Sequence, residues 1–212
     1  MTSAFIFTDG PSFIHFSKVN RRPFSPLLQK HTMKKIVLNL AVSLDGFIEG
    51  PNGEIDWCIM DDDMDFGAFL DSVDTLLYGR VSYDAWGQYQ PEATAEAAEL
   101  KLWEAVHSKK KFVFSREPRQ DAYATFIASE IAENIANIKN QADKDIWLYG
   151  GANLIKTFII LDLIDLYRIF VHPVVLGAGK PLFEGLKERL RLQLIDTRVF
   201  KSGVVELVYE KQ

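Results

Sequence analysis

From residue 33 onward, apolar runs rich in β-forming residues alternate with stretches that carry apolar residues at helical spacing. This alternation is typical of an α/β fold built on a largely parallel sheet. The last two apolar runs are separated only by residues 201–203, which predicts that the sheet ends in an antiparallel hairpin. We expect strands over residues 35–43, 74–79, 111–115, 145–149, 165–175, 191–199 and 203–210. We expect helices over residues 62–72, 80–87, 95–107, 129–140 and 152–161.

The stretch 129–140 illustrates how a helix is predicted. Ile131, Ile135 and Ile138 occupy positions i, i+4 and i+7, so they share one side of a helix. Ser129 is expected to cap the first turn, because a serine hydroxyl accepts a hydrogen bond from the free N–H groups there. The apolar side of this helix has to cover a face of the sheet.

Residues 1–32 differ from the rest of the chain. They contain three of the eight prolines and five of the fifteen phenylalanines, without a helix or strand period. The sequence TDGP at 8–11 interrupts the apolar run that a secretory signal would need. We expect a loosely attached extension over residues 1–32, followed by one α/β domain over residues 33–212.

Composition excludes several classes of function. Hydrophobic residues make up 48% and charged residues 25%, as in ordinary globular proteins, and no apolar run has membrane-spanning length. The net charge of −5 argues against a general nucleic-acid binder. Cys58 is the only cysteine, which excludes an intramolecular disulfide and thiolate metal clusters and favours the cytoplasm. The four histidines are scattered, so no metal site is expected.

A glycine pair, Gly150 and Gly151, lies between the apolar run 145–149 and the helical stretch 152–161. Glycine lets a ligand approach the backbone closely, and the free N–H groups at the start of a helix favour an anion. A pyrophosphate is the expected ligand. A tight turn that needs positive φ is the alternative, and the glycine pair alone leaves both interpretations open.

Two further strand ends carry groups that suit phosphate. In LLYGRVSYDAW (76–86), Arg80 follows a glycine, and its guanidinium can bind phosphate or stack on adenine. In FVFSRE (112–117), Ser115 and Arg116 lie just beyond an apolar run. A solvated surface is the alternative for each residue taken alone. Three such strand ends together predict one shared phosphate-binding edge.

Five stretches carry a resemblance to a known family: LAVSLDGFIEG (40–50), GRVSYDAW (79–86), FSR (114–116), IWLYGGANL (146–154) and HPVVLGAGKPLF (172–183). In order and spacing they resemble the dihydrofolate-reductase-like family that includes the reductase domain of bacterial riboflavin biosynthesis. The resemblance covers nearly all of residues 33–210. It implies a predominantly parallel, twisted sheet flanked by helices and ending in an antiparallel strand pair, with NADPH across the strand ends. It also implies a homodimer formed near the last strands.

The resemblance assigns cofactor contacts by position. The first turn would meet the adenosine phosphates, the second the 2′-phosphate that distinguishes NADPH from NADH, and the third the pyrophosphate. The cofactor-binding residues that it implies are Arg80, Val81 and Ser82, then Ser115 and Arg116, then Gly150, Gly151, Ala152, Asn153 and Leu154.

Candidates on the substrate side are fewer. Asp45, in SLDG at the end of the first strand, is the first choice for a carboxyl group that orients the acceptor or relays a proton. Asp56 is a rival carboxyl group and a candidate substrate contact. Trp57 is expected either to wall a planar substrate or to fill the core. Phe66 and Tyr83 complete the expected substrate contacts.

The leading hypothesis is an NADPH-dependent reductase that acts on a C=N or C=O bond of a small planar or heterocyclic compound. A non-catalytic nucleotide-binding or interaction protein that retains the fold is one alternative, since fold does not settle function. A riboflavin-pathway 5-amino-6-(5-phosphoribosylamino)uracil reductase is another. Phe47 follows SLDG where riboflavin-pathway reductases carry a lysine, which argues against a phosphoribosyl substrate.

Overall fold

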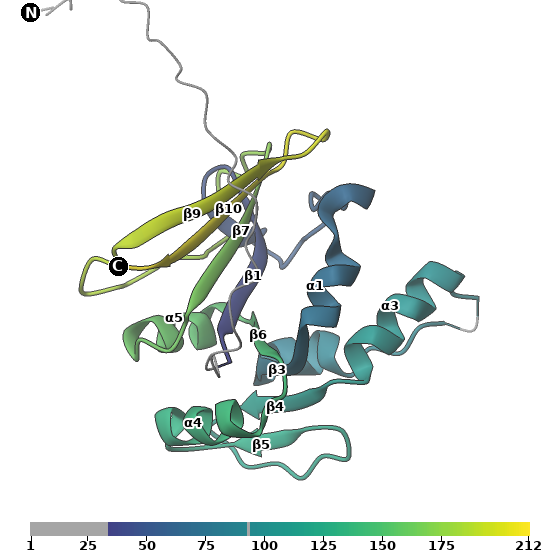
Figure 1. Cartoon of the computed structure of the whole chain (residues 1–212). Coiled ribbons are helices and arrows are strands. Elements are labelled where there is room, and N and C mark those ends of the chain that lie inside the picture. Colours follow the sequence, from purple (N-terminus) through teal and green to yellow (C-terminus); the bar gives the residue numbers. More distant parts are fainter. Residues whose placement is uncertain (1–33, 93) are drawn as a thin grey trace, which may run out of the picture. The chain divides into compact units, whose positions relative to one another are not determined.

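The computed structural model describes residues 34–92 and 94–212, and an eight-stranded sheet forms its centre (Figure 1). The spatial order of the strands is β5 (Thr125–Ile127), β4 (Lys110–Phe114), β3 (Val73–Gly79), β6 (Asp145–Gly150), β1 (Ile36–Ser43), β7 (Leu166–His172), β10 (Val205–Lys211) and β9 (Leu192–Val199). Every pairing from β5 to β7 is parallel, whereas β10 is antiparallel to β7 and β9. The predicted fold class is therefore confirmed. The extension expected over residues 1–32 lies outside the described residues.

Helices cover both faces of the sheet. In Figure 1, α1 (Phe66–Ser72) and α3 (Ala97–His107) lie on one face, and α4 (Ile131–Gln141) and α5 (Ala152–Ile160) lie on the other. Three short helical turns complete the set: η1 (Asp62–Met64), α2 (Arg80–Ser82) and η2 (Tyr83–Gly87). A small second sheet pairs β2 (Phe47–Glu49) with β8 (Lys180–Pro181). Within the described part of the chain, no helix has the length and apolarity to cross a membrane.

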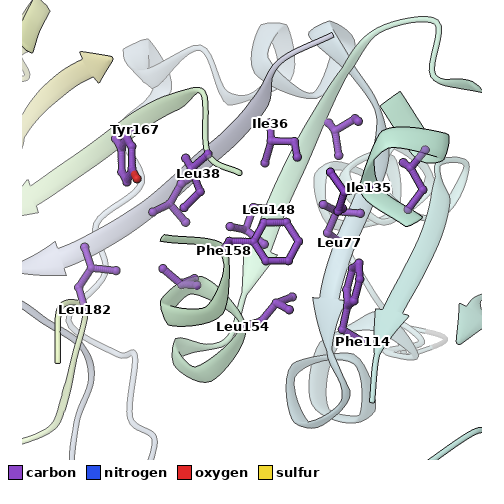
Figure 2. Close-up of a cluster of buried hydrophobic side chains, with 14 of the residues drawn as sticks. Ile36, Leu38, Leu77, Phe114, Ile135, Leu148, Leu154, Phe158, Tyr167 and Leu182 are labelled. Atoms are coloured by element: carbon purple, nitrogen blue, oxygen red, sulfur yellow. The ribbon is translucent and has the colours of Figure 1, made fainter. Parts of the chain in front are cut away.

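The core is divided between the two faces by the alternation of side chains along each strand. Leu38 and Leu148 point to the face that Phe158 of α5 covers, as Figure 2 shows. Val37 and Trp147, one residue away on the same two strands, belong to the cluster on the α1 side. Strands buried on both faces read as continuous apolar runs, which is why these segments were recognisable in the sequence.

Some predicted boundaries are wrong, and each has a local cause. Strand β7 stops at His172 instead of residue 175, because Pro173 has no N–H to donate. The helix expected to begin at residue 62 begins at Phe66, since Asp65 has a left-handed backbone with φ of 52° that separates it from η1. Ser129 is not the cap of α4; Glu130 is, and no side-chain hydrogen bond caps this helix.

Phe158 offers a test of the core on the α5 side. The ring is fully buried and meets Phe114 edge-on, with ring centroids 5.5 Å apart. We expect Phe158→Ala to lower the free energy of unfolding by about 3–5 kcal/mol, because the lost contacts leave a cavity. Ile160→Ala, on the exposed side of the same helix, is the control and should cost less than about 0.5 kcal/mol. Urea unfolding measures both, and equal losses would contradict this description of the core.

Candidate functional site

Three strand ends meet at one edge of the sheet. Gly79 at the end of β3 pairs in register with Phe114 at the end of β4, and Tyr78 pairs with Gly150 at the end of β6. The three turns that follow these strands are therefore neighbours. They carry the expected cofactor-binding residues except Leu154, whose side chain lies in the core, so the structure brings the others to a common edge.

The turns after β3 and β6 lie close together, most tightly between Gly151 and the Ser82 side chain. A Cβ atom on Gly151 would lie 2.9 Å from Ser82 Oγ, and one on Gly79 would lie 3.5 Å from the Gly150 carbonyl oxygen. Gly150 has φ of 120°, a backbone conformation that favours glycine. Ala152 and Asn153 then open α5, whose first N–H groups have no acceptor within the helix. This arrangement suits an anion.

Charged side chains flank this edge. Arg80 and Arg119 both pair with the Asp84 carboxylate, at 2.9 and 2.8 Å, and these three side chains are partly exposed. Arg119 also pairs with Asp121 at 3.3 Å. Arg116 is exposed in the turn after β4. The Ser115 hydroxyl donates to the Glu117 carbonyl oxygen at 2.8 Å and accepts from the Glu117 N–H at 3.1 Å. Ser115 therefore has to leave its own turn before its hydroxyl can donate to a ligand.

The edge continues into a cavity of about 340 Å³. Its floor is the α1-side face of the sheet, and its walls are α1 and the segment between β2 and η1. Ser82 and Gly151 line its end nearest the three turns. The floor consists of Asn39 and Ala41 from β1, Trp147 and Tyr149 from β6, and Phe170 and His172 from β7. The walls include Ile55, Cys58, Ile59, Met60 and Phe66.

Two uncharged polar groups stand out on the aromatic floor. Asn39 is 6% exposed, and its side-chain oxygen has no hydrogen-bond partner. The Trp147 indole N–H donates to the Asn39 backbone carbonyl at 3.1 Å, so this donor is already used. Burial raises the pKa of Tyr149 to about 12, and its hydroxyl is therefore protonated at neutral pH. The floor can donate and accept hydrogen bonds without carrying charge.

His172 connects the segment between β2 and η1, here called the wall segment, to the sheet. Its Nδ1 lies 3.0 Å from the Phe170 carbonyl oxygen, and its Nε2 lies 3.2 Å from the Ile59 carbonyl oxygen. Trp57 meets the imidazole edge-on, with ring centroids 5.4 Å apart. Trp57 thus contacts His172 but is not itself among the residues that line the cavity.

The Asp45 carboxylate holds the turn after β1 against the segment after β7. It accepts hydrogen bonds from Ser43 Oγ at 2.7 Å and from the backbone N–H groups of Leu176 and Gly177 at 3.1 and 2.8 Å. The bond from Ser43 is the main cause of its lowered pKa, so the group is ionised at neutral pH. Asp45 does not line the cavity. Its role in orienting a substrate or relaying a proton stays a prediction.

The positions of two predicted contacts correct their assignments. Tyr83 is fully buried between Tyr78 and Phe126, and its hydroxyl donates to Asp121 at 2.8 Å. It supports the sheet and is not accessible to a substrate. The Leu154 side chain is buried in the core, and its N–H donates to the Gly151 carbonyl oxygen. Neither its side chain nor its N–H is free to contact a cofactor.

Of the other predicted substrate contacts, one lines the cavity and one does not. Phe66 lines the cavity, as expected for a substrate contact, whereas Asp56 is exposed and lies outside the lining. Val81 is also exposed, at the shared edge. The sequence interpretation missed Asn39, Tyr149 and His172. A polar residue inside the apolar run IVLNLAVS was the one available signal, and it pointed to Asn39.

Cys58 is the only thiol in the chain, so its reaction rate measures how accessible the wall segment is. Burial, and secondarily the Asp56 charge, raises its pKa to about 11, so only about 0.1% is thiolate at pH 8 and its modification should be slow. We expect His172→Ala to accelerate its reaction with an aromatic disulfide reagent at least severalfold, because the wall segment loses its anchor. His107→Ala, which removes a contact to Trp103, is the control. An unchanged rate in His172→Ala would show that the anchor is unimportant.

Comparisons with known proteins agree with this fold. A family model described as the RibD C-terminal domain matches residues 34–206. The chain is 56% identical over 177 residues to the uncharacterized protein YyaP of Bacillus subtilis (strain 168), a match that covers 83% of this chain and 94% of YyaP.

Two solved structures share the fold at lower sequence identity. A Shewanella sp. PV-4 protein named for riboflavin biosynthesis matches with a TM-score of 0.69 and 24% identity, covering 84% of this chain and 99% of that one. The dihydrofolate reductase of Enterococcus faecalis, complexed with NADP(H), matches with a TM-score of 0.58 and 16% identity, covering 85% and 98%. The chain therefore belongs to the RibD C-terminal domain family and has the dihydrofolate-reductase-like fold.

Proposed function

We propose that the protein is an NADPH-dependent reductase of a small planar or heterocyclic compound. The observation that carries this proposal is the continuity between a glycine-lined, cation-flanked edge and an aromatic cavity. The edge suits a dinucleotide, and the cavity suits a flat acceptor next to it. The NADP(H) complex of the Enterococcus faecalis enzyme, which has the same fold, supports this choice of cofactor.

The residues at the edge fit the phosphates of NADPH. The N–H groups of Ala152 and Asn153 at the start of α5 would hold a pyrophosphate. Arg80 would exchange Asp84 for a phosphate. Their ion pair is exposed and worth at most about 1 kcal/mol, whereas a hydrogen bond between charged groups is worth about 1.5–3 kcal/mol. Arg116 would meet the 2′-phosphate.

NADPH, when bound, supplies the hydride that converts C=N to CH–NH, or C=O to CH–OH, together with one proton from another source. The chain contributes binding, orientation and exclusion of water. Trp147 and Phe170 would hold the flat ring, and the protonated Tyr149 hydroxyl would donate a hydrogen bond to the acceptor nitrogen or oxygen. Asp45 would relay the proton only if it left the Leu176 and Gly177 N–H groups that now hold it.

A riboflavin-pathway uracil reductase is the second candidate, and the family match favours it. Two observations weigh against a phosphoribosyl substrate: Phe47 pairs with Pro181 in the small sheet, and none of the described residues that line the cavity is lysine or arginine. Loss of riboflavin prototrophy on deletion would favour this candidate. The absence of a saturable NADPH response would instead favour a non-catalytic protein.

The phosphate assignment is tested with two cofactors that differ only in the 2′-phosphate. We expect Arg116→Ala to weaken NADPH binding about tenfold or more and to leave NADH binding unchanged, because one charge-assisted hydrogen bond is lost. Tryptophan fluorescence measures both affinities, since Trp86 and Trp147 line the cavity. Arg189→Ala removes an exposed arginine elsewhere and is the control. Equal affinity of the parent protein for NADPH and NADH would refute the assignment.

We also propose a homodimer that uses β9. This strand is at the edge of the sheet, and Leu194, Ile195 and Val199 are exposed on it. An unpaired edge with apolar side chains is a ready surface for a second copy. Light scattering should give twice the chain mass for the parent and the chain mass for Val199→Glu. Gln193→Glu, which adds the same charge at a polar position of β9, should stay dimeric. A monomeric parent would contradict the proposal.

A further inference from the structure

The middle of the wall segment, residues 51–60, is tied to the sheet by one hydrogen bond. These residues form no helix or strand, and most of them are exposed. His172 Nε2 lies 3.2 Å from the Ile59 carbonyl oxygen. Within the described chain, the other hydrogen bonds of residues 51–60 all stay between Gly50 and Cys58. The hold of the sheet on this segment therefore depends on the state of one imidazole ring.

Both ring nitrogens of His172 face hydrogen-bond acceptors. Nδ1 lies 3.0 Å from the Phe170 carbonyl oxygen, and Nε2 faces the carbonyl oxygen of Ile59. A neutral imidazole has one N–H group, so it donates to one of these oxygens and turns a lone pair toward the other. An imidazolium has an N–H group on each nitrogen and donates to both. Because the residue is only 2% exposed, water has little access to replace a missing donor.

Two opposing effects act on the proton of this ring. Burial disfavours the charged imidazolium. Hydrogen bonds from a charged donor are roughly twice as strong as neutral ones, and a buried carbonyl oxygen that faces a lone pair is costly. Donation to two carbonyl oxygens therefore offsets the burial of the charge.

The groups on β1 and on the wall segment favour a positive charge at the ring. Ser43 on β1 pairs in register with this histidine, and its hydroxyl donates to the ionised Asp45 carboxylate at 2.7 Å. The wall segment contributes Asp56, Cys58 and Asp61. Burial raises the pKa of Cys58 to about 11, so its thiol is neutral. These two elements thus bring carboxylates and no cation close to the imidazole.

The cations on the other elements around the ring are paired or exposed. Arg168, on the same strand, pairs with Glu206 of β10, and Lys180 of the small sheet pairs with Glu49. Lys201, in the hairpin before β10, is exposed. The ring therefore meets an excess of negative charge, which favours its protonated form.

We propose that His172 is a proton-dependent tether of the cavity wall. With both ring nitrogens protonated, it holds residues 51–60 against the sheet. When Nε2 loses its proton, a lone pair faces the Ile59 carbonyl oxygen, and the wall segment moves away from the floor. Nδ1 keeps its proton, because its bond to Phe170 is shorter and stays within one strand. His172 is thus a positioning residue and not a catalytic one. The tether is independent of what the cavity binds, whereas its control of access for an acceptor rests on the proposed reductase function.

The protonation of the ring can be read directly. Long-range proton–nitrogen NMR spectra of the isotope-labelled full chain distinguish protonated from unprotonated ring nitrogens, and the chain has four histidines. His172→Gln removes one set of signals and so assigns the ring. We expect both nitrogens to be protonated at about pH 5.5 and Nε2 to be unprotonated at about pH 9, on either side of the usual titration range of histidine. The same form at both pH values would overturn the proposal.

Pulsed hydrogen exchange measures whether the wall follows the proton. We expect the amide protection of residues 51–60, corrected for the intrinsic effect of pH, to fall about tenfold between these pH values, because a charge-assisted hydrogen bond is lost. His172→Gln has no proton to lose in this range, so it should abolish the pH dependence and leave the protection of α4 unchanged. His107→Gln makes the same substitution at the end of α3 and should preserve the dependence.

The outcomes separate the tether from the proposed function. Equal protection of residues 51–60 at both pH values in the parent would overturn the tether, and so would an unchanged pH dependence in His172→Gln. The exchange measurement on the parent decides the proposal even if the glutamine variant does not fold. Neither measurement uses a nucleotide, so a failure of NADPH binding, which would refute the reductase, leaves the result on the tether intact.

Discussion

The close approach of β3 and β6 where they leave the sheet is the contact on which the site depends. Gly150 has φ of 120°, and a side chain at Gly151 would displace the Ser82 hydroxyl. Parallel strands place their carboxyl ends at one edge, and β4 adds its own turn beside β3 in register. The edge is therefore a property of sheet order together with the glycine pair after β6. The helix start at Ala152 and the arginines only complete it.

The same strand serves the core and the cavity. Along β1, Ile36 and Leu38 pack in the α5-side core, while Asn39 lies on the opposite face and lines the cavity. A one-residue slip would move the amide into an apolar layer and expose a leucine to the cavity. Pairing with β6 and β7 on both sides prevents this slip. The position of Asn39 in the cavity lining is thus determined by burial of its neighbours.

Local sequence patterns predicted the helices and strands. Which side chains face the cavity and which face the core depends on packing between these elements. The glycine turn at Gly150 could be predicted because a strand, a glycine pair and a helix follow one another along the chain. Tyr83 was misassigned because helical spacing does not reveal that Phe126, in a three-residue strand, covers that side. Tyr149 was read only as part of an apolar run. Its contact with the cavity depends on which face of β6 meets α1, which no local pattern encodes.

The two ends of the site differ in the charged side chains that they offer to a ligand. At the edge, Arg80 and Arg119 pair with the Asp84 carboxylate, and Arg119 also pairs with Asp121 at 3.3 Å, so two carboxylates balance the two guanidinium groups before any ligand binds. Asp84 reduces the repulsion between the two guanidinium groups and also competes with an incoming phosphate. Arg116 is exposed and adds a positive charge. We infer that Arg116, together with an exchange of the exposed Arg80–Asp84 ion pair for a phosphate, favours a phosphate-bearing ligand at the edge. The cavity floor around Asn39 has no arginine or lysine among its described lining residues, so it lacks this attraction for an anion.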